Sequence, residues 1–247
     1  MKTRKGIPSK AVKVKRSEIN FARNLLFIFG AVFLLAAGFT GASYAGLFGN
    51  SETLLYRVTA SVETPEGIKT GSAVCEASHY YETSFFPGQG GTSYNIVKGE
   101  AVVVDLGKRG ILFALNGHNE IRPVSQLFRD KAKKSKITLA IEDYPIFVRF
   151  RDLNDPKTIE NVRSADEIEK IRQEDPKRPL ISFKDAFGIG VNVKEVTIEV
   201  AFDPVTDMIE KYLPWVSMIG GGNLGGGKFN GEEWYERLSR SEFKKGF

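Results

Sequence analysis

Asp105, Asp152 and Asp203 are the side chains of this 247-residue chain that could act as paired carboxylates. Two carboxyls that face one cleft can divide the roles of acid and of base or nucleophile, as in glycoside hydrolysis. Separation along the chain does not prevent such residues from meeting in space. Each also suits a structural role in a turn or a cap. A hydrolase that uses these carboxylates is therefore one alternative function, and two of them in one cleft would be its signature.

The two histidines, His79 and His118, do not form a recognisable catalytic or metal-binding motif. Neither stands in H-x-x-x-H or H-E-x-x-H spacing, and no G-x-S-x-G motif offers a nucleophilic serine. The single cysteine, Cys75, excludes an intramolecular disulfide and a zinc site of several thiolates. Cys75 lies in an alternating apolar run, which favours a small buried residue over a reactive thiol.

Two further motifs resemble ligand loops but lack essential parts. The tract "GGGNLGGGK", residues 220–228, matches part of a phosphate-binding loop, but Phe229 stands where that loop needs Ser or Thr. Asp152, Asn154 and Asp155 begin like a calcium loop, but the downstream glycine and glutamate are absent. An Asx-turn explains the same residues. We therefore expect no metal ion and no cofactor.

Aromatic side chains gather in a Gly-rich stretch between two predicted hairpins. They could form an exposed surface that binds a small ligand or peptide, or a contact close to a membrane. Packing in the core is the other interpretation, and it is the one that we favour. Rigid hairpins often present functional loops, so this is where we expect a ligand site if there is one. The residues are Tyr80, Tyr81, Phe85, Phe86 and Tyr94.

The positive charge of the chain is concentrated at its N-terminus. Residues 1–24 hold eight Lys or Arg and one acid, which gives this segment a charge of +7. The net charge is +5, so the remainder carries −2. Because the folded part is close to neutral, a nucleic-acid-binding domain is not predicted.

An apolar stretch without any charged residue follows the basic tail, from Leu25 to Phe48. Roughly 20 such residues are what a helix needs to cross a bilayer. The positive-inside rule then predicts a cytoplasmic tail, residues 1–24, and a periplasmic main domain. A secretory signal cleaved after Ser43-Tyr44-Ala45 is the alternative. Both interpretations place the main domain outside the cytoplasm. With an uncleaved anchor, we expect a single-pass protein of a bacterial inner membrane.

The exported part, residues 54–215, reads as a β-rich α+β domain. Residues 56–62 alternate between apolar and polar, Pro65 and Gly67 mark a turn, and residues 68–77 resume a strand. Residues 102–115 form a second hairpin whose arms are apolar at nearly every position, as in strands buried on both faces. We expect antiparallel hairpins in a sandwich- or barrel-like arrangement.

Further elements follow from shorter signals. Residues 146–150 and 191–200 read as strands, and residues 124–134 as a short amphipathic helix. Ser164 with Glu167 forms a capping box for a charged surface helix. A helix is also predicted to start at Asp203-Pro204. The C-terminal segment, residues 216–247, is rich in glycine near its start, which predicts a flexible loop or linker.

Four segments together resemble a family of uncharacterised proteobacterial proteins with an N-terminal export or anchor segment. They are "YRVTASVETPEGIKTGSAV", "GEAVVVDLGKRGILFAL", "YPIFVRFRDLNDP" and "VKEVTIEVAFDPVTDMIEKYLPW". The resemblance spans residues 56–215 in the same order. It implies a bacterial envelope protein and no reaction.

The absence of an assembled catalytic or metal-binding set in the sequence favours a non-enzymatic role. We expect a structural or interaction module of the bacterial envelope, with the lipid bilayer and an envelope protein as partners and no nucleic acid. The carboxylate hydrolase and the module that binds a small ligand or peptide remain as alternatives.

Overall fold

The computed structural model describes residues 50–82, 91–117, 121–130, 136–174, 179–219, 222–224 and 234–247. Among these, Ser51–Tyr81 and Thr92–Phe247 form one compact unit. The predicted basic tail and transmembrane helix lie outside the described residues. The compact unit is therefore the part of the chain whose architecture bears on function.

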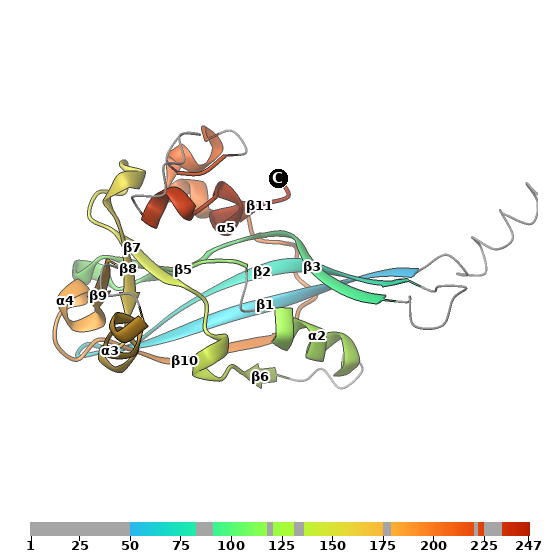
Figure 1. Cartoon of the computed structure of the whole chain (residues 1–247), viewed down its shortest axis with the longest axis horizontal. Coiled ribbons are helices and arrows are strands. Elements are labelled where there is room, and N and C mark those ends of the chain that lie inside the picture. The colour runs from blue at the N-terminus through green and yellow to red at the C-terminus, as the bar shows by residue number, and fades with distance from the viewer. Residues whose placement is uncertain are drawn as a thin grey trace, which may run out of the picture. The chain divides into compact units, whose positions relative to one another are not determined.

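Two β-sheets form this unit (Figure 1). The larger sheet has the strand order β11-β3-β2-β1-β10-β6, and the smaller has β4-β5-β7-β8-β9. The predicted β-rich class is confirmed, although β8 and β9 pair in parallel. The strands are β1 Asn50–Thr64, β2 Gly67–Glu82, β3 Gly91–Glu100, β4 Val102–Asp105, β5 Ile111–Ala114, β6 Lys136–Thr138, β7 Phe147–Phe150, β8 Ile159–Arg163, β9 Leu180–Ser182, β10 Asn192–Val200 and β11 Lys244–Lys245.

The described helices are short, and several are single 3₁₀ turns. The surface helix predicted from Ser164 is confirmed as α3, because Glu167 accepts hydrogen bonds from both the backbone N–H and the hydroxyl of Ser164. The α-helices are α2 Ile121–Asp130, α3 Ala165–Glu174, α4 Phe183–Phe187 and α5 Arg240–Phe243; the 3₁₀ turns are η1 Gly107–Arg109, η4 Ile141–Asp143, η5 Pro156–Thr158, η6 Ile209–Lys211, η7 Pro214–Ser217 and η8 Trp234–Arg237.

The predicted first hairpin is confirmed as β1 and β2. Gly67 has a φ of 113°, which glycine adopts without a steric penalty. The Thr64 hydroxyl closes the turn by donating to the Gly67 carbonyl oxygen at 2.7 Å. The arms are longer than predicted, with 15 and 16 residues. Each arm therefore extends for about 50 Å.

Alternation in β1 puts one face of the strand into the core, as predicted. Tyr56, Val58, Ala60 and Val62 are each at most 2% exposed. The partner strand is β10, far along the chain, which pairs antiparallel with residues 56–63 of β1. This pairing gives the first strand of the domain a neighbour on each side in the larger sheet.

The second predicted hairpin is also present, as β4 and β5. Its arms are covered on both sides: Val104 and Leu112 belong to one buried cluster, while Phe113 belongs to another. The predicted burial of both faces is found even though β4 lies at a sheet edge. Burial of both faces needs a covering layer above and below, and it does not need a strand on each side.

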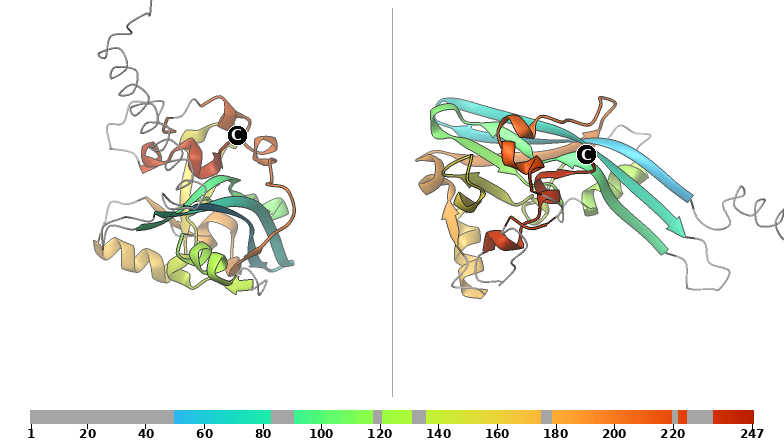
Figure 2. Two further views of the ribbon diagram at one scale, coloured as in Figure 1. Left: turned by 90° about the vertical axis from the view of Figure 1, so that its right-hand side faces the viewer. Right: turned by 90° about the horizontal axis from the view of Figure 1, so that it is seen from above.

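Two apolar clusters hold the layers together. The first lies between the two sheets and includes side chains from β1, β2, β10, β4, β5, β7, α2 and α4. The second lies on the opposite face of the smaller sheet, where β5, β7 and β8 contact the chain after residue 208. The smaller sheet is thus a middle layer, covered by the larger sheet on one side and by C-terminal elements on the other (Figures 1 and 2).

The helix predicted at Asp203-Pro204 is not formed. Residues 204–208 have no regular structure, and only the 3₁₀ turn η6 follows. The Asp203 carboxylate accepts from Arg57 of β1, and Thr206 exchanges hydrogen bonds with the Val74 backbone of β2. Tertiary contacts therefore outweigh the local helix-start signal, and the segment runs as a strap from β1 across to β2.

The compact unit continues past Trp215 to the end of the chain. Val216, Leu224, Leu238 and Phe243 are all at most 5% exposed and join the second cluster. The domain end expected at residue 215 thus falls inside the fold. Gly220, Gly221 and residues 225–233 lie outside the described residues, so the linker prediction applies to them alone.

One end of the larger sheet is fastened by Arg109. Its guanidinium donates to both carboxylate oxygens of Glu66, at 2.9 and 2.8 Å, and to the Phe187 carbonyl oxygen at 2.9 Å. Glu66 lies in the β1–β2 turn, Arg109 in η1 and Phe187 at the end of α4. The Arg109 side chain therefore connects three parts of the fold: the β1–β2 turn of the larger sheet, η1 between β4 and β5 of the smaller sheet, and the end of α4. The hydrogen bonds from Arg109 lower the pKa of Glu66 from 4.5 to about 2.

We expect the substitution Glu66→Gln to lower stability at neutral pH and to have less effect in acid. A carboxylate whose pKa is depressed by folding stabilises the folded state above its unfolded pKa, and this contribution disappears as pH falls through the folded pKa. The difference in Tm between wild type and Glu66→Gln should thus be complete above pH 4.5 and vanish toward pH 2. Thermal unfolding followed by circular dichroism measures it. A difference that stays constant over this range would show that the charge of Glu66 is not its source.

Candidate functional site

Three strands of the larger sheet extend beyond the rest of the domain at one end (Figures 1 and 2). The ladder between β1 and β10 starts at Tyr56, and β11 contacts β3 only at Gly99 and Glu100. The residues beyond these points are called the three-strand extension. It comprises residues 51–55 of β1, 77–81 of β2 and 92–97 of β3.

The strand directions bring three separate parts of the chain to the tip of this extension. β1 and β2 are the arms of one hairpin, so the last residues of β2 lie beside the first residues of β1. β2 and β3 are antiparallel neighbours, since Cys75 lies against Gly99 and His79 stacks on Tyr94. The tip therefore holds the start of β1, the end of β2 and the start of β3.

Aromatic packing covers one face of the extension. The His79 ring stacks on Tyr94, with centroids 4.6 Å apart and planes 9° apart, and Phe128 of α2 contacts both rings. Phe128 is 6% exposed. These contacts give His79 a role in packing. They also put α2 at the base of the extension.

Tyr80 and Tyr81 lie further out and are exposed, at 40% and 50%. Side chains alternate along a strand, so Tyr81 is on the face of His79 and Tyr80 is on the other face. Phe202 is 74% exposed and follows Ala201, whose backbone N–H donates to the Leu55 carbonyl oxygen of β1. Of the exposed aromatic residues in the described ranges, only Phe247 lies elsewhere.

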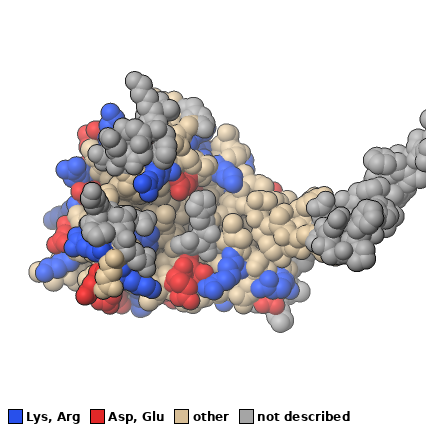
Figure 3. Space-filling model, in the orientation of Figure 1, with Lys and Arg blue, Asp and Glu red and all other residues tan. Residues whose placement is uncertain are grey.

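The extension carries almost no charge. Glu52 is its single charged residue, and it has no Lys or Arg. In the face shown in Figure 3, charged side chains gather over the body of the domain, and the visible part of the extension is largely free of them. The surface is therefore aromatic and polar, with none of the cations that a nucleic acid or an acidic partner would require.

The predicted aromatic site is thus divided by the structure. Tyr80 and Tyr81 are exposed near each other at the end of β2, whereas Tyr94 is half-buried in the stack with His79. Phe85 and Phe86 lie outside the described residues. Core packing is therefore the correct interpretation for Tyr94, and an exposed surface is the correct one for Tyr80 and Tyr81.

The candidate hydrolase carboxylates each have a hydrogen-bond or ion-pair partner. Asp105 accepts from the Gly107 backbone N–H at 2.8 Å, and Asp152 accepts from the Asn154 N–H at 2.9 Å. Asp203 pairs with Arg57. Asp105 and Asp152 have the turn roles that the sequence also allowed, and the Asx-turn interpretation of Asp152 is confirmed, whereas Asp203 forms a long-range ion pair and caps no helix. In the described part of the chain, no group of three or more His, Cys, Asp and Glu side chains is placed to hold a metal ion.

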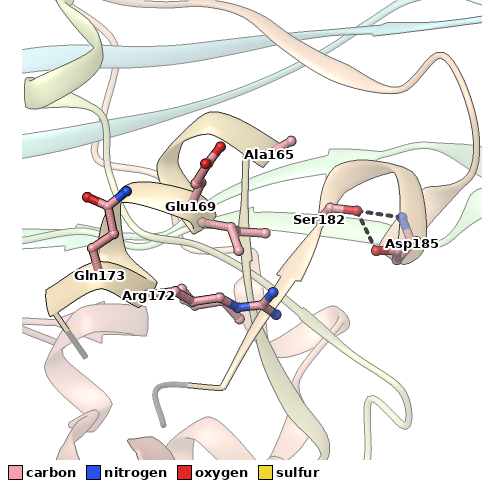
Figure 4. A pocket seen from close by; sticks show the side chains of 8 residues that line it. Ala165, Glu169, Arg172, Gln173, Ser182 and Asp185 are labelled. Carbon is pink, nitrogen blue, oxygen red and sulfur yellow. Dashed lines mark hydrogen bonds between the residues drawn. The ribbon is translucent and has the colours of Figure 1, made fainter. Parts of the chain in front are cut away.

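A surface hollow of about 570 Å³ lies between α3, β9 and α4 (Figure 4). Its polar lining includes Glu169, Arg172 and Gln173. The Ser182 hydroxyl donates to the Asp185 carboxylate at 2.7 Å and accepts from the Asp185 N–H at 3.0 Å. This pair caps α4. Among the described residues, the lining of the hollow includes no histidine or lysine beside Ser182 that could act as its base.

A smaller cavity of about 220 Å³ lies between β3, α2 and the C-terminal residues, and Asn116 is in its lining. The Asn116 side chain is buried, and neither of its amide atoms has a hydrogen-bond partner among the described residues. Both atoms are also covered from solvent. The amide therefore cannot offer a hydrogen bond to a molecule in this cavity without a rearrangement.

Two buried charges were missed by sequence reasoning, and both fasten the C-terminal layer. Glu100 is 5% exposed and accepts from the backbone N–H groups of Met208 and Ile209, at 2.7 and 2.9 Å. Lys244 donates to Asp207 and Glu210. Burial alone lowers the pKa of Lys244, but these two carboxylates outweigh it and the pKa is raised. The available signal is that Glu100 stands directly before the apolar run 101–104, because a carboxylate that is buried with such a run must be paired.

No protein-family model, curated protein or solved structure matches the chain. The resemblance to proteobacterial exported proteins therefore remains a prediction. Among the helices that the structure describes, none combines the length and apolar character needed to span a membrane. The three-strand extension, with Tyr80 and Tyr81, is the surface that best fits a binding role.

Proposed function

We propose that this chain is a membrane-anchored bacterial envelope protein whose periplasmic domain has a non-enzymatic structural or interaction role. In this proposal the uncharged stretch Leu25–Phe48 is the anchor, and the basic residues before it stay in the cytoplasm. The observation that carries the proposal is the position of β1. Its first residue, Asn50, follows the apolar stretch after one glycine, so the long sheet continues directly from the predicted anchor.

The partners of the candidate carboxylates support the non-enzymatic part of the proposal. Asp105, Asp152 and Asp203 each have a partner that accounts for the residue without a substrate. Long paired strands with buried charges at their base also make the domain a rigid support. Such a support suits a module that presents a binding surface on rigid strands.

Fractionation of a bacterium that makes the full chain tests the anchor. We expect the protein to stay in the membrane pellet after alkaline carbonate extraction, to keep its N-terminal tail, and to be digested by protease added to spheroplasts. The substitutions Leu34→Arg and Leu35→Arg together should release it, since each costs about 2.5–3.5 kcal/mol in the centre of a membrane helix. Leu34→Ala with Leu35→Ala is the matched control. A mature protein that starts near Gly46 would support the cleaved signal and refute the anchor.

A further inference from the structure

The path of the chain sets the depth of the sheet tip relative to the predicted anchor. The apolar stretch ends at Phe48, and β1 begins at Asn50. Two residue steps span at most about 7 Å. The polar layer on each side of the hydrocarbon core is of about that thickness. If the anchor spans the membrane as proposed above, the start of β1 therefore lies within the outer headgroup layer.

Tyr80 and Tyr81 must then lie at a similar depth. They are the last described exposed residues of β2, beside the start of β1 in the same hairpin. Neighbouring strands are about 4.8 Å apart, so a tyrosine ring on β2 is within one side-chain length of β1. We propose that the tip of the three-strand extension enters the outer headgroup layer of the membrane, with Tyr80 and Tyr81 as its interfacial contacts.

Tyr80 and Tyr81 are exposed on opposite faces of the sheet, which indicates that the tip enters the headgroup layer with its strands steeply inclined to the bilayer. Tyr80 and Tyr81 are consecutive and point to opposite faces of the sheet. If the sheet lay flat on the membrane, only one of them would reach lipid. With the strands steeply inclined to the bilayer, both rings lie in the headgroup layer, where tyrosine places its ring among apolar groups and its hydroxyl in water.

The lack of positive charge in the three-strand extension indicates which kind of lipid it can contact. A contact with anionic lipid depends on clustered Lys and Arg. The extension has neither, and its one charged residue, Glu52, is an acid. The lipid surface that fits is therefore a zwitterionic one, and the contact rests on the aromatic rings. It should not become stronger when anionic lipid is added.

The depth of the tip can be measured with a fluorophore on single cysteines in the full chain. The native Cys75 is 1% exposed, and Cys75→Ala removes its background. Thr92→Cys marks the exposed start of β3 beside the tyrosines, and Ile68→Cys marks the opposite end of the larger sheet, where Ile68 is 54% exposed. Ala36→Cys marks the centre of the predicted anchor. Each labelled protein is reconstituted into phosphatidylcholine vesicles with spin-labelled lipids that quench at a shallow or a deep position.

We expect shallow spin labels to quench the Thr92 fluorophore and to leave the Ile68 fluorophore unquenched. The double substitution Tyr80→Ser with Tyr81→Ser should reduce quenching at residue 92. Replacing a third of the lipid by phosphatidylglycerol should not increase it. Equal and weak quenching at residues 92 and 68 would overturn the inference, as would a tip protected from water but not quenched by lipid, which would indicate a protein partner.

The Ala36 fluorophore separates the two proposals. Deep quenching at residue 36 without quenching at residue 92 would refute the lipid contact of the tip and leave the anchor intact. No deep quenching at residue 36 would refute the anchor itself, and the inference about the tip would fail with it.

Discussion

Replacing Phe243 by alanine should lower the free energy of unfolding by about 3–5 kcal/mol, the usual cost of removing a buried aromatic side chain. Phe243 is fully buried, and its ring contacts Phe150 and Trp215 with centroids 5.9 and 5.8 Å apart. Its carbonyl oxygen also accepts from the Ala101 N–H at 2.9 Å. Phe243 is thus one of the residues through which the C-terminal layer packs on the smaller sheet, together with Trp215 and the other members of the second cluster.

Local structure explains how Phe243 reaches that position. Ser239 and Glu242 form a capping box that starts α5, and this single helical turn directs Phe243 inward. β11 follows at once and pairs with β3. The Ser239–Glu242 cap, the Phe243 ring and strand β11 lie within seven consecutive residues. Because β11 directly follows Phe243, the loss of the ring should also weaken the pairing of β11 with β3 at the edge of the larger sheet.

Urea unfolding followed by tryptophan fluorescence measures this effect, because Trp215 lies against Phe243. Phe247→Ala is the matched control: the same residue type, four positions later and 40% exposed. Its ring contacts the side-chain ammonium groups of Lys98 and Lys244, and its loss should cost about 0.5–1 kcal/mol. If Phe243→Ala unfolds within 1 kcal/mol of wild type, the C-terminal layer does not stabilise the domain.

The same region shows where local signals stop being sufficient. The β1–β2 hairpin can be predicted because Pro65, Gly67 and the alternating residues act within a few positions of each other. The glycines before α5 indicate a linker. No residue close to Phe243 in the sequence indicates that its ring packs against Phe150. The Ser239–Glu242 box was the signal that could have predicted α5.

The other differences between the predicted and the observed fold arise from contacts between residues far apart in the sequence. β10 reads clearly as a strand, but its place next to β1 depends on contacts between residues about 140 positions apart, such as Tyr56 and Val200. Asp203-Pro204 begins a helix by local criteria, and the ion pair with Arg57 directs the chain elsewhere. For the candidate site, the aromatic composition could be predicted, while the division into exposed Tyr81 and stacked Tyr94 depends on α2.

Gly71 determines how closely the two sheets approach each other. It lies in β2, and a Cβ atom built there would overlap the Val103 carbonyl oxygen and come within 2.7 Å of the carbonyl carbon. Its backbone is not in the left-handed region, so conformational freedom is not what requires glycine here. The requirement is the direct contact between the main chains of β2 and β4. Because the main chains approach so closely here, apolar side chains of the two sheets can contact each other in the first cluster.

We expect Gly71→Ala to destabilise the protein by about 3 kcal/mol, at the upper end of the overpacking range because the obstacle is main chain and cannot rotate away. Gly91→Ala is the matched control, since its Cβ would meet nothing within 4 Å and its φ is not positive. That change should be neutral or slightly stabilising, because alanine reduces the entropy of the unfolded chain. Thermal and urea unfolding of the two variants compare them directly. Equal stability of the two would mean that β2 and β4 can separate without cost, and that the sheets do not form the rigid support on which the position of the tyrosine-bearing tip depends.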